Sequence, residues 1–376
     1  MLIKPLSQAI ILASLTATAF ADTPTIGEVL NASGISVTGY VDAAYTHFDT
    51  VKNLAPSDNI NYFDHDHSTF DLKQAGITIA SQPKEGFGAL VNLTAGSDAD
   101  QIHSIGGSSS NLDVTQAFIQ YATGSVTAMA GKFNTLAGAE VIAPTGNTNI
   151  SHSIAFLNAI PFTHTGVRVA YTPVDILTLY AGVNNGWDQQ KDQNTQKTVE
   201  LGLSLTPNDM VNWTLQGYSG AENGIANAGA PTTHPTLRTV LDTVLTVKPI
   251  ADLSLVLNAD TGKQEDAHGI NTPTAKWSSI VGYVNYAFTS EWHSSLRYEV
   301  FDDKEGEKLG LVDLNDPTIT NKKVKAATLT VGYAPTSHVE LRGEVRQDRA
   351  DNNVFVKGNS PTDKQNYLAL EGYYKF

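Results

Sequence analysis

Residues 198–209 read TVELGLSLTPND, and this stretch carries the two signals that decide the fold. Leucine or valine occupies every second position from 199 to 205, and polar or small residues occupy the positions between them. This period of two predicts a β-strand with one apolar face. Pro207 follows, and proline fixes φ for a tight turn and cannot donate a hydrogen bond to a paired strand. The stretch therefore predicts a strand that ends in a short turn.

The same unit recurs along the chain, and this repetition distinguishes it from a half-buried strand of a soluble protein. From residue 34 onward, alternating segments of roughly ten residues are separated by turn signals, a pattern typical of an outer-membrane barrel. Short connections fall at residues 82–85, 123–124, 172–175, 206–209, 248–250, 289–290 and 334–337. Long polar connections lie around residues 49–67, 97–111, 134–164, 187–197, 221–235, 263–275, 303–323 and 349–364. These seven short and eight long connections predict an all-β fold, a transmembrane antiparallel β-barrel of about 16 strands.

Both chain ends should lie on the side of the short turns, because the strand number is even. In outer-membrane barrels the short turns are periplasmic and the long loops extracellular. The last strand ends on Phe376, which resembles the signal read by the barrel-assembly machinery of Gram-negative bacteria. Aromatic residues gather just before the short turns: Tyr121, Tyr171, Tyr286, Phe288 and Tyr333. They indicate an interfacial girdle, although strands are in any case rich in tyrosine and phenylalanine.

The N-terminal residues predict export. Lys4 precedes an apolar run at residues 9–15 and an Ala-Phe-Ala sequence at 19–21, so we expect residues 1–21 to be a secretory signal peptide. No later segment reaches the roughly 18 to 20 consecutive apolar residues that a membrane helix requires. We expect residues 22–33 to form a short periplasmic lead and residues 34–376 a single barrel domain.

Composition argues against two other classes of protein. The chain has no cysteine, so it has no disulfide framework and needs another source of stability, such as a closed sheet. Its formal net charge of -14 argues against a nucleic-acid partner, because phosphate contacts need a basic surface. The Gly-Gly-Ser-Ser-Ser stretch at 106–110 lacks the lysine and helix of a phosphate-binding loop, and we expect no cofactor.

If the apolar set of each strand faces lipid, the alternate polar set lines a lumen. The candidate lumen-lining residues are Asp42, Glu200, Arg238, Asp242, Arg297, Glu299, Glu340, Arg342, Glu344 and Arg346. A sixteen-strand barrel is wide enough to leave an aqueous channel, so a pore is the default function. The lining mixes both signs, whereas acidic residues such as Glu305 and Glu307 fall in the long loops. Acidic mouths concentrate cations, so we expect a weak cation preference.

Several motifs resemble a known family. They lie at residues 131–133, 138–140, 147–153, 160–168, 171–173 and 185–188. Together with the Gly-Tyr-Val-Asp start at 39–42 and the phenylalanine-terminated last strand, they resemble the OmpL-like putative beta-barrel porin-2 family of proteobacteria. The resemblance is densest between residues 131 and 222 and implies an outer-membrane porin for passive diffusion of small hydrophilic solutes and ions. It offers no catalytic residues.

Residues 134–164 form the third long loop, which holds one carboxylate, no lysine or arginine, and several apolar residues that need a surface to pack against. In general porins the third loop folds inward and narrows the channel, and we expect the same here. The candidate constriction residues are Glu140, Asn147, Asn149, His152, Asn158, His164 and Arg168. Arg168 could oppose Glu140 across the constriction, or the two could form an ordinary structural ion pair.

Other functions have weaker support. A substrate-selective channel remains an alternative, and so does a structural or adhesive barrel that the inward loop blocks. An outer-membrane hydrolase could use Ser151 and His152, but adjacent residues on an extended chain point apart, so we expect no enzyme. The Asp-His-Asp-His run at 64–67 is the one metal-like sequence, and nothing nearby completes a ligand set. Expected partners are outer-membrane lipids, lipopolysaccharide and small solutes, with a homotrimer as a hypothesis by analogy.

Overall fold

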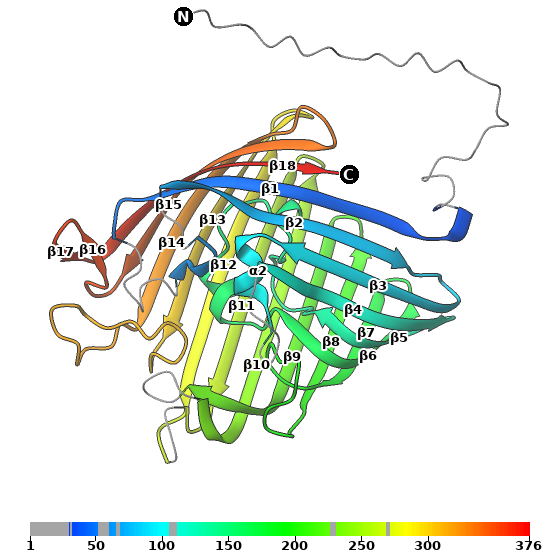
Figure 1. Cartoon of the computed structure of the whole chain (residues 1–376), viewed down its shortest axis with the longest axis horizontal. Helices are drawn as coiled ribbons and strands as arrows, with labels where there is room; N and C mark the ends of the chain where they lie inside the picture. The colour runs from blue at the N-terminus through cyan, green and yellow to red at the C-terminus, as the bar shows by residue number, and fades with distance from the viewer. Residues whose placement is uncertain are drawn as a thin grey trace, which may run out of the picture.

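The computed structural model describes residues 30–376 except 31, 52–59, 65–67, 105–110, 226–230 and 268–270. Within these residues, sixteen strands pair antiparallel and close into one barrel, with β1 between β2 and β18 (Figure 1). The barrel strands are β1 (Ser36–Phe48), β2 (Thr69–Ser81), β3 (Gly86–Ala95), β4 (Leu112–Thr123), β5 (Val126–Asn134), β6 (Thr163–Val174), β7 (Leu177–Asn184), β8 (Thr198–Asn208), β9 (Val211–Ile225), β10 (Pro231–Ile250), β11 (Leu253–Gln264), β12 (Ala275–Ala287), β13 (Trp292–Asp303), β14 (Lys323–Tyr333), β15 (Val339–Ala350) and β18 (Lys364–Lys375). The predicted fold is confirmed.

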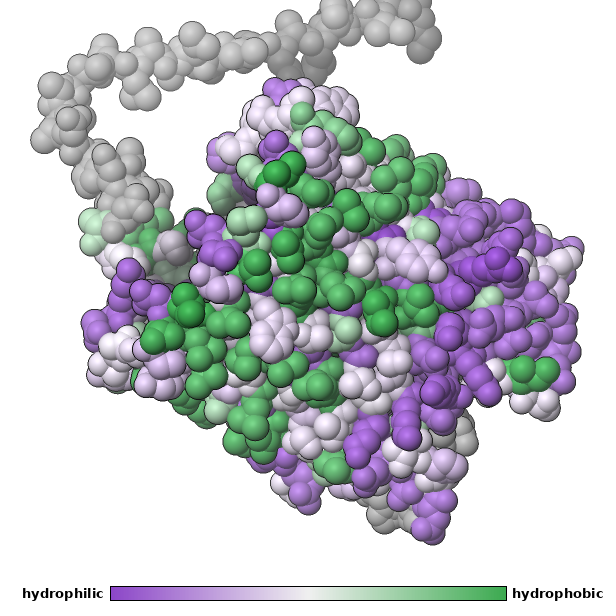
Figure 2. Space-filling model, turned by 180° about the vertical axis from the view of Figure 1, so that it is seen from behind, coloured by the Kyte–Doolittle hydropathy of each residue, from purple (hydrophilic) through white to green (hydrophobic). Residues whose placement is uncertain are grey.

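Alternation along each strand places apolar side chains outside and polar ones inside. On β15, Leu341 and Val345 are each 52% exposed, whereas Arg342 and Arg346 are each 3% exposed. Figure 2 shows the outer apolar side chains as a broad band, with hydrophilic residues gathered toward one end. A charged residue is costly against lipid and is tolerated in a polar lumen, so the exposed apolar band is the membrane-facing surface. None of the helices in the described residues is long and apolar enough to cross a membrane.

Short turns and long loops alternate around the barrel as the sequence predicts. We name the eight long connections L1 to L8 in chain order; they cover residues 49–68, 96–111, 135–162, 185–197, 226–230, 265–274, 304–322 and 351–363. L8 carries the hairpin of β16 (Phe355–Lys357) and β17 (Ser360–Thr362), which projects from one end of the barrel (Figure 1). L5 is shorter than the predicted 221–235, because β9 and β10 continue their backbone pairing through a register shift between Pro231 and Pro235.

Three prolines that the sequence places in short turns lie instead at the ends of strands. Pro173, Pro207 and Pro249 lie within the last residues of β6, β8 and β10, and not in the turns themselves. In each case the pairing shifts register across the proline, for example between Leu205 and Asn208. A residue without an N–H cannot donate to the ladder, so a bulge takes it out of the pairing before the turn.

The barrel closes where the first and last strands meet. The backbone N–H of Phe376 donates to the Gly39 carbonyl (2.9 Å), and the Gly39 N–H donates back to Phe376 (3.0 Å). At this turn-bearing end, Trp292 stacks on Tyr333 with ring centroids 4.6 Å apart. Phe87 lies 4.8 Å from Tyr121 and is 79% exposed, as a ring at a membrane interface would be.

The apolar core lies inside the barrel, and the long loops build most of it. The helix α3 (Ile154–Asn158) of L3 contributes Ile154, Phe156 and Leu157. Residues from L1, L2, L7 and L8 join the same cluster: Ile60, Phe63, Ile102, Leu309, Leu311 and Phe355. Inward side chains of the wall complete it, among them Trp277 and Phe301. The apolar residues of L3 therefore pack inside the barrel.

Candidate functional site

L3 runs inside the barrel and is bonded to the inner face of the wall on several strands. It contains the short 3-10 helix η3 (Pro144–Gly146) and α3. The Gly138 N–H donates to Asp242 Oδ1 on β10 (3.0 Å), and the Ala139 N–H donates to Asn258 Oδ1 on β11 (3.1 Å). On the opposite side, Gln74 of β2 donates to the Ile142 carbonyl (3.1 Å). L3 thus crosses the lumen.

Glu140 is the central anchor of L3. Its Oε1 lies 2.8 Å from Arg297 Nη1 on β13 and accepts a hydrogen bond from the Tyr283 hydroxyl of β12 (2.9 Å). Its Oε2 accepts from the Ser153 N–H (2.7 Å). Burial alone would raise the pKa of this carboxyl, but the Arg297 guanidinium, His152 and these donors outweigh burial and hold the pKa below its ordinary value.

Two wall carboxylates bind backbone N–H groups of L3. Glu344 of β15 accepts from Ile150 (2.7 Å) and from Ser151 (3.0 Å), one N–H on each oxygen. Glu299 of β13 accepts from Ile154 (2.7 Å), the first residue of α3, where a helix has N–H groups without an internal partner. Both carboxylates therefore satisfy amides that would otherwise be buried without a partner.

Three wall arginines bind backbone carbonyls of L3. Arg297 donates to the Ser151 carbonyl (2.5 Å), Arg346 to His152 (2.7 Å) and Arg342 to Asn147 (2.6 Å). Arg342 and Arg346 also pair with Glu371 and Asp348, respectively, which are inward-facing carboxylates of the wall. This arrangement explains why the predicted lumen lining carries both charge signs. The wall carboxylates accept hydrogen bonds from backbone N–H groups of L3, and the wall guanidinium groups donate to backbone carbonyls of the same loop.

The predicted constriction residues within L3 mostly hold the loop in place. His152 packs against two rings, with its centroid 4.8 Å from that of Phe63 and 4.5 Å from that of Phe156. The remaining three side chains make polar contacts: Asn147 Nδ2 donates to the Val141 carbonyl (2.7 Å), Asn149 to Thr330 of β14 (2.6 Å) and Asn158 to the Ile154 carbonyl (3.2 Å). His152 is only 6% exposed, so its ring is a packing element of L3.

Arg168 pairs with Glu200, and the predicted pair with Glu140 does not form. The Arg168 Nε lies 2.8 Å from Glu200 Oε1, and both side chains are buried. They sit on β6 and β8, and between them in the same row lies Gly182 of β7, which pairs with both residues. A Cβ at Gly182 would lie 3.0 Å from Glu200 Oε2. The missing side chain lets arginine and glutamate meet across the intervening strand.

The other predicted residues lie on the inner wall or next to it. His164 of β6 stacks on Tyr218 with centroids 4.7 Å apart. Arg238 donates to Gln264 (2.6 Å), and Asp42 is buried on β1. Glu340 lies within 3.1 Å of His293 Nε2. All ten predicted lumen residues therefore point inward, but most of their polar groups are bound by neighbours or by L3.

Ser151 and His152 do not form a catalytic pair. The Ser151 hydroxyl accepts from Arg297 Nη2 (3.0 Å), and the His152 Nε2 lies 3.1 Å from the Val141 carbonyl and 3.2 Å from Asn147. In the 64–67 run, Asp64 lies 3.5 Å from Lys73, and the other three residues are outside the described part of the chain. No group of three potential metal ligands occurs among the residues that the structure describes.

Sequence reasoning missed several wall residues that bind L3. Tyr283 and Thr330 each contact the loop directly, and the Trp277 indole N–H donates to the Ala159 carbonyl (3.2 Å). All three occupy inward positions of their strands, so the period-two pattern was the signal that could have found them.

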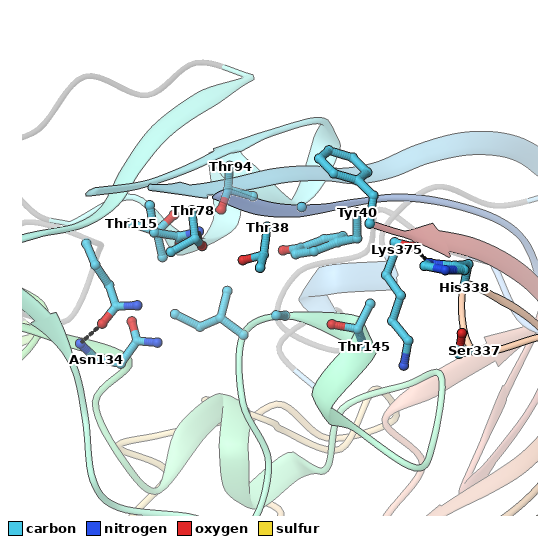
Figure 3. A pocket seen from close by; sticks show the side chains of 16 residues that line it. Thr38, Tyr40, Thr78, Thr94, Thr115, Asn134, Thr145, Ser337, His338 and Lys375 are labelled. Carbon is cyan, nitrogen blue, oxygen red and sulfur yellow. Dashed lines mark hydrogen bonds between the residues drawn. The ribbon is translucent and has the colours of Figure 1, made fainter. Parts of the chain in front are cut away.

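The open part of the lumen lies on the side of L3 toward β1 to β5. A cavity of about 510 Å³ that is open to solvent is lined there by Thr38, Thr78, Asn92, Thr115 and other wall residues, and by Ile142, Ala143 and Thr145 of L3 (Figure 3). Its lining also includes His338 and Lys375, which lie at the end of the barrel that carries the short turns. L3 therefore separates this cavity from the apolar core.

Comparisons with known proteins agree with this architecture. The family model described as "Putative beta-barrel porin-2, OmpL-like" matches residues 34–376. Among solved structures, the anion-selective porin from Comamonas acidovorans has a TM-score of 0.61 at 10% identity, covering 91% of this chain and 99% of that one. The outer membrane channel DcaP of Acinetobacter baumannii has 0.59 at 12%, covering 91% and 97%. OmpT of Vibrio cholerae in its trimer form has 0.59 at 10%, covering 91% and 99%. None of the curated proteins compared matches this chain.

Proposed function

This chain belongs to the putative beta-barrel porin-2, OmpL-like family, and we propose that it forms a water-filled channel through which small hydrophilic solutes and ions diffuse passively. The observation that carries the proposal is the position of L3, which Glu140 and Arg297 fix inside a sixteen-strand barrel. The loop crosses the lumen and leaves an open cavity on the side toward β1 to β5, and the width of the passage beside the loop would set the conductance. The exposed residues of L3, such as Val141 and Gly146, are the surface that solutes would pass.

The family and the fold place the chain in a Gram-negative outer membrane. We propose further that residues 1–21 direct its export and that 22–33 form a periplasmic lead; both lie almost entirely outside the described residues. The apolar outer band would contact lipid, and the loop end would meet lipopolysaccharide. Phe376 would be read by the barrel-assembly machinery, and its backbone bonds to Gly39 would form last as the barrel closes.

The channel would prefer cations weakly. The net charge of -14 and the acidic residues of L7 favour cations at the mouth. Inside the barrel, arginines and carboxylates neutralise each other or bind L3, so the passage has little fixed charge of either sign. Reversal potentials across a salt gradient measure this preference, and clear anion selectivity would contradict it.

A homotrimer is the assembly we propose, by analogy with the trimer form of the similarly folded OmpT of Vibrio cholerae. Light scattering of the detergent-solubilised protein tests the assembly. A particle of monomer mass after subtraction of detergent would argue for independent barrels.

Single-channel conductance in planar bilayers tests the channel function itself. The wild-type protein should open a stable aqueous pore, and deletion of residues 143–158 should raise its conductance because this removes most of the inward loop. A matched control deletes residues 190–196, a mostly exposed part of L4. If the deletion of 143–158 leaves conductance unchanged, L3 does not restrict the pore.

One observation favours a second candidate, a barrel that is closed at rest. The apolar cluster inside the barrel combines residues of L1, L2, L3, L7 and L8, which pack like a soluble core. Such packing would leave no passage unless the loops move. Absence of any open state in the bilayer measurement would support this structural barrel and reject the porin.

A further inference from the structure

The wall of the cavity beside L3 carries several uncharged side chains that can form hydrogen bonds. Hydroxyl groups come from Thr38, Thr78 and Thr115, and amides from Asn92 and Gln116. Figure 3 shows the three threonines around one space, with Thr145 of L3 facing the Thr38 side. The volume of about 510 Å³ falls within the roughly 300–1,000 Å³ typical of small-molecule sites.

Charged residues are confined to the rim. Among the side chains of the sixteen lining residues, that of Lys375 is the only one with a full charge at neutral pH, and it lies at the short-turn end next to His338. No aspartate or glutamate side chain lines the cavity, and the carboxylate of the last residue, Phe376, belongs to the same rim as Lys375. The acidic and basic residues of β10 to β15 face L3 from its other side and are bound there. L3 therefore lies between the bound charged residues of β10 to β15 and this cavity.

Part of the hydrogen-bonding capacity of this wall is already ordered. Thr115 donates to Thr94 (2.7 Å), and Asn92 donates to Thr78 (2.8 Å), so the hydroxyls are held in fixed positions. The Asn134 Oδ1 is buried and has no hydrogen-bond partner among the described residues. A buried acceptor at a cavity wall is stable when a donor fills the space beside it. Tyr40 adds a ring face, and its hydroxyl is fixed by Gln74 (2.8 Å).

We propose that this cavity is a binding site for uncharged polyhydroxylated solutes, such as short saccharides or polyols, on the periplasmic side of L3. Hydroxyl-rich solutes offer both donors and acceptors, which match threonine hydroxyls, amides and the free Asn134 oxygen. A charged solute would lose part of its hydration shell on entering the cavity, and the threonine and amide side chains of the wall would offer it no opposite charge in return. The inference rests on the proposed channel function, because solutes must reach the cavity through the barrel.

Ion current through the full-length protein in a planar bilayer tests this proposal, with maltose as the probe. Maltose added at the short-turn end should reduce the current in a saturable way, and more strongly than maltose added at the loop end. The double variant Thr38→Val/Thr78→Val removes two hydroxyls, and the maltose concentration for half-block should rise at least about fivefold. The matched control Thr261→Val removes an exposed hydroxyl of the outer wall and should leave the block unchanged.

Three outcomes would overturn the proposal in distinguishable ways. A conducting channel whose current falls only in proportion to solution viscosity would reject the binding site while the channel function stands. Stronger block by gluconate than by maltose would show that charge, supplied by Lys375, decides binding. A protein that never conducts would reject the proposed function and this site together. Heat-modifiable migration on gels verifies that each variant has folded before its current is interpreted.

Discussion

Arg297 of β13 and Glu140 of L3 form an ion pair, with Nη1 and Oε1 2.8 Å apart, although 157 residues separate them in the sequence. Burial of two charges is costly unless the remaining polar atoms are also satisfied. Here Ser151 and Thr328 accept hydrogen bonds from Arg297, and Tyr283 donates one to Glu140. The pair therefore couples the position of the loop to one inward position of the wall.

Arg297→Met should release L3 and enlarge the pore. Methionine keeps much of the side-chain volume but leaves Glu140 buried without its counter-charge, a loss that costs about 3–5 kcal/mol in comparable pairs. We expect a higher and noisier single-channel conductance and a lower unfolding temperature.

The control for this variant is Arg349→Met. Arg349 pairs with Asp363 at 3.2 Å, but its side chain is 61% exposed, so the loss should be about 0–1 kcal/mol. Equal conductance in Arg297→Met and wild type would mean that the pair does not hold the loop.

Acidification should loosen L3 only at a pH below the ordinary pKa of a glutamate side chain. Burial raises the pKa of Glu140, but Arg297, His152 and the Ser153 N–H outweigh it, so the net pKa lies below the ordinary 4.5. A carboxyl with a depressed pKa stabilises the docked loop fully above pH 4.5 and loses this contribution as pH falls through the depressed value. Conductance measured from pH 7 downward should stay constant until the solution is more acidic than 4.5.

The variant Glu140→Gln mimics the protonated carboxyl, so at pH 7 it should already show the changed conductance that the wild type reaches only in acid. A wild-type conductance that changes between pH 7 and 5 would assign the transition to another group.

The sequence predicts the barrel, its strand number and the inward loop because these depend on periodic, local signals. The alternation of Leu341 and Val345 with Arg342 and Arg346 is a property of neighbouring residues, and the structure confirms it. Turn prolines are equally local, although Pro207 lies in a bulge at the strand end and not in the turn. Boundaries shift by a few residues because pairing across strands decides where a strand stops.

Partners across the lumen could not be predicted in the same way. The sequence places Arg168 and Glu140 near one loop, yet Arg168 reaches Glu200 because Gly182 leaves a gap on the strand between them. Likewise, nothing local connects Glu140 to Arg297. Such pairs depend on strand register around the barrel, which periodicity alone does not fix.

Leu201→Arg tests which face of the wall meets lipid. Leu201 is 62% exposed on the outer face of β8, next to the buried Glu200. An arginine there should destabilise the membrane-inserted barrel by about 2–4 kcal/mol if the position lies near the bilayer midplane. Leu314→Arg is the matched control, because Leu314 is 39% exposed in L7, outside the strands. Reversible urea unfolding in lipid vesicles measures both; equal stability would mean that β8 does not face hydrocarbon.

Lys308 should make the docking of L7 depend on pH. Its Nζ lies 4.2 Å from the ring centroids of Trp187 and Trp277, and burial together with the Arg238 charge lowers its pKa from 10.5 to about 7. The released loop therefore binds more protons between these two values, so docking gains stability as pH rises from 7 toward 10.5. Hydrogen exchange of residues 304–322, corrected for intrinsic rates, should slow over this window.

Lys308→Met should remove the pH dependence of this exchange, whereas Lys304→Met, at an exposed position of the same loop, should keep it. Persistence of the dependence in Lys308→Met would place the titrating group elsewhere.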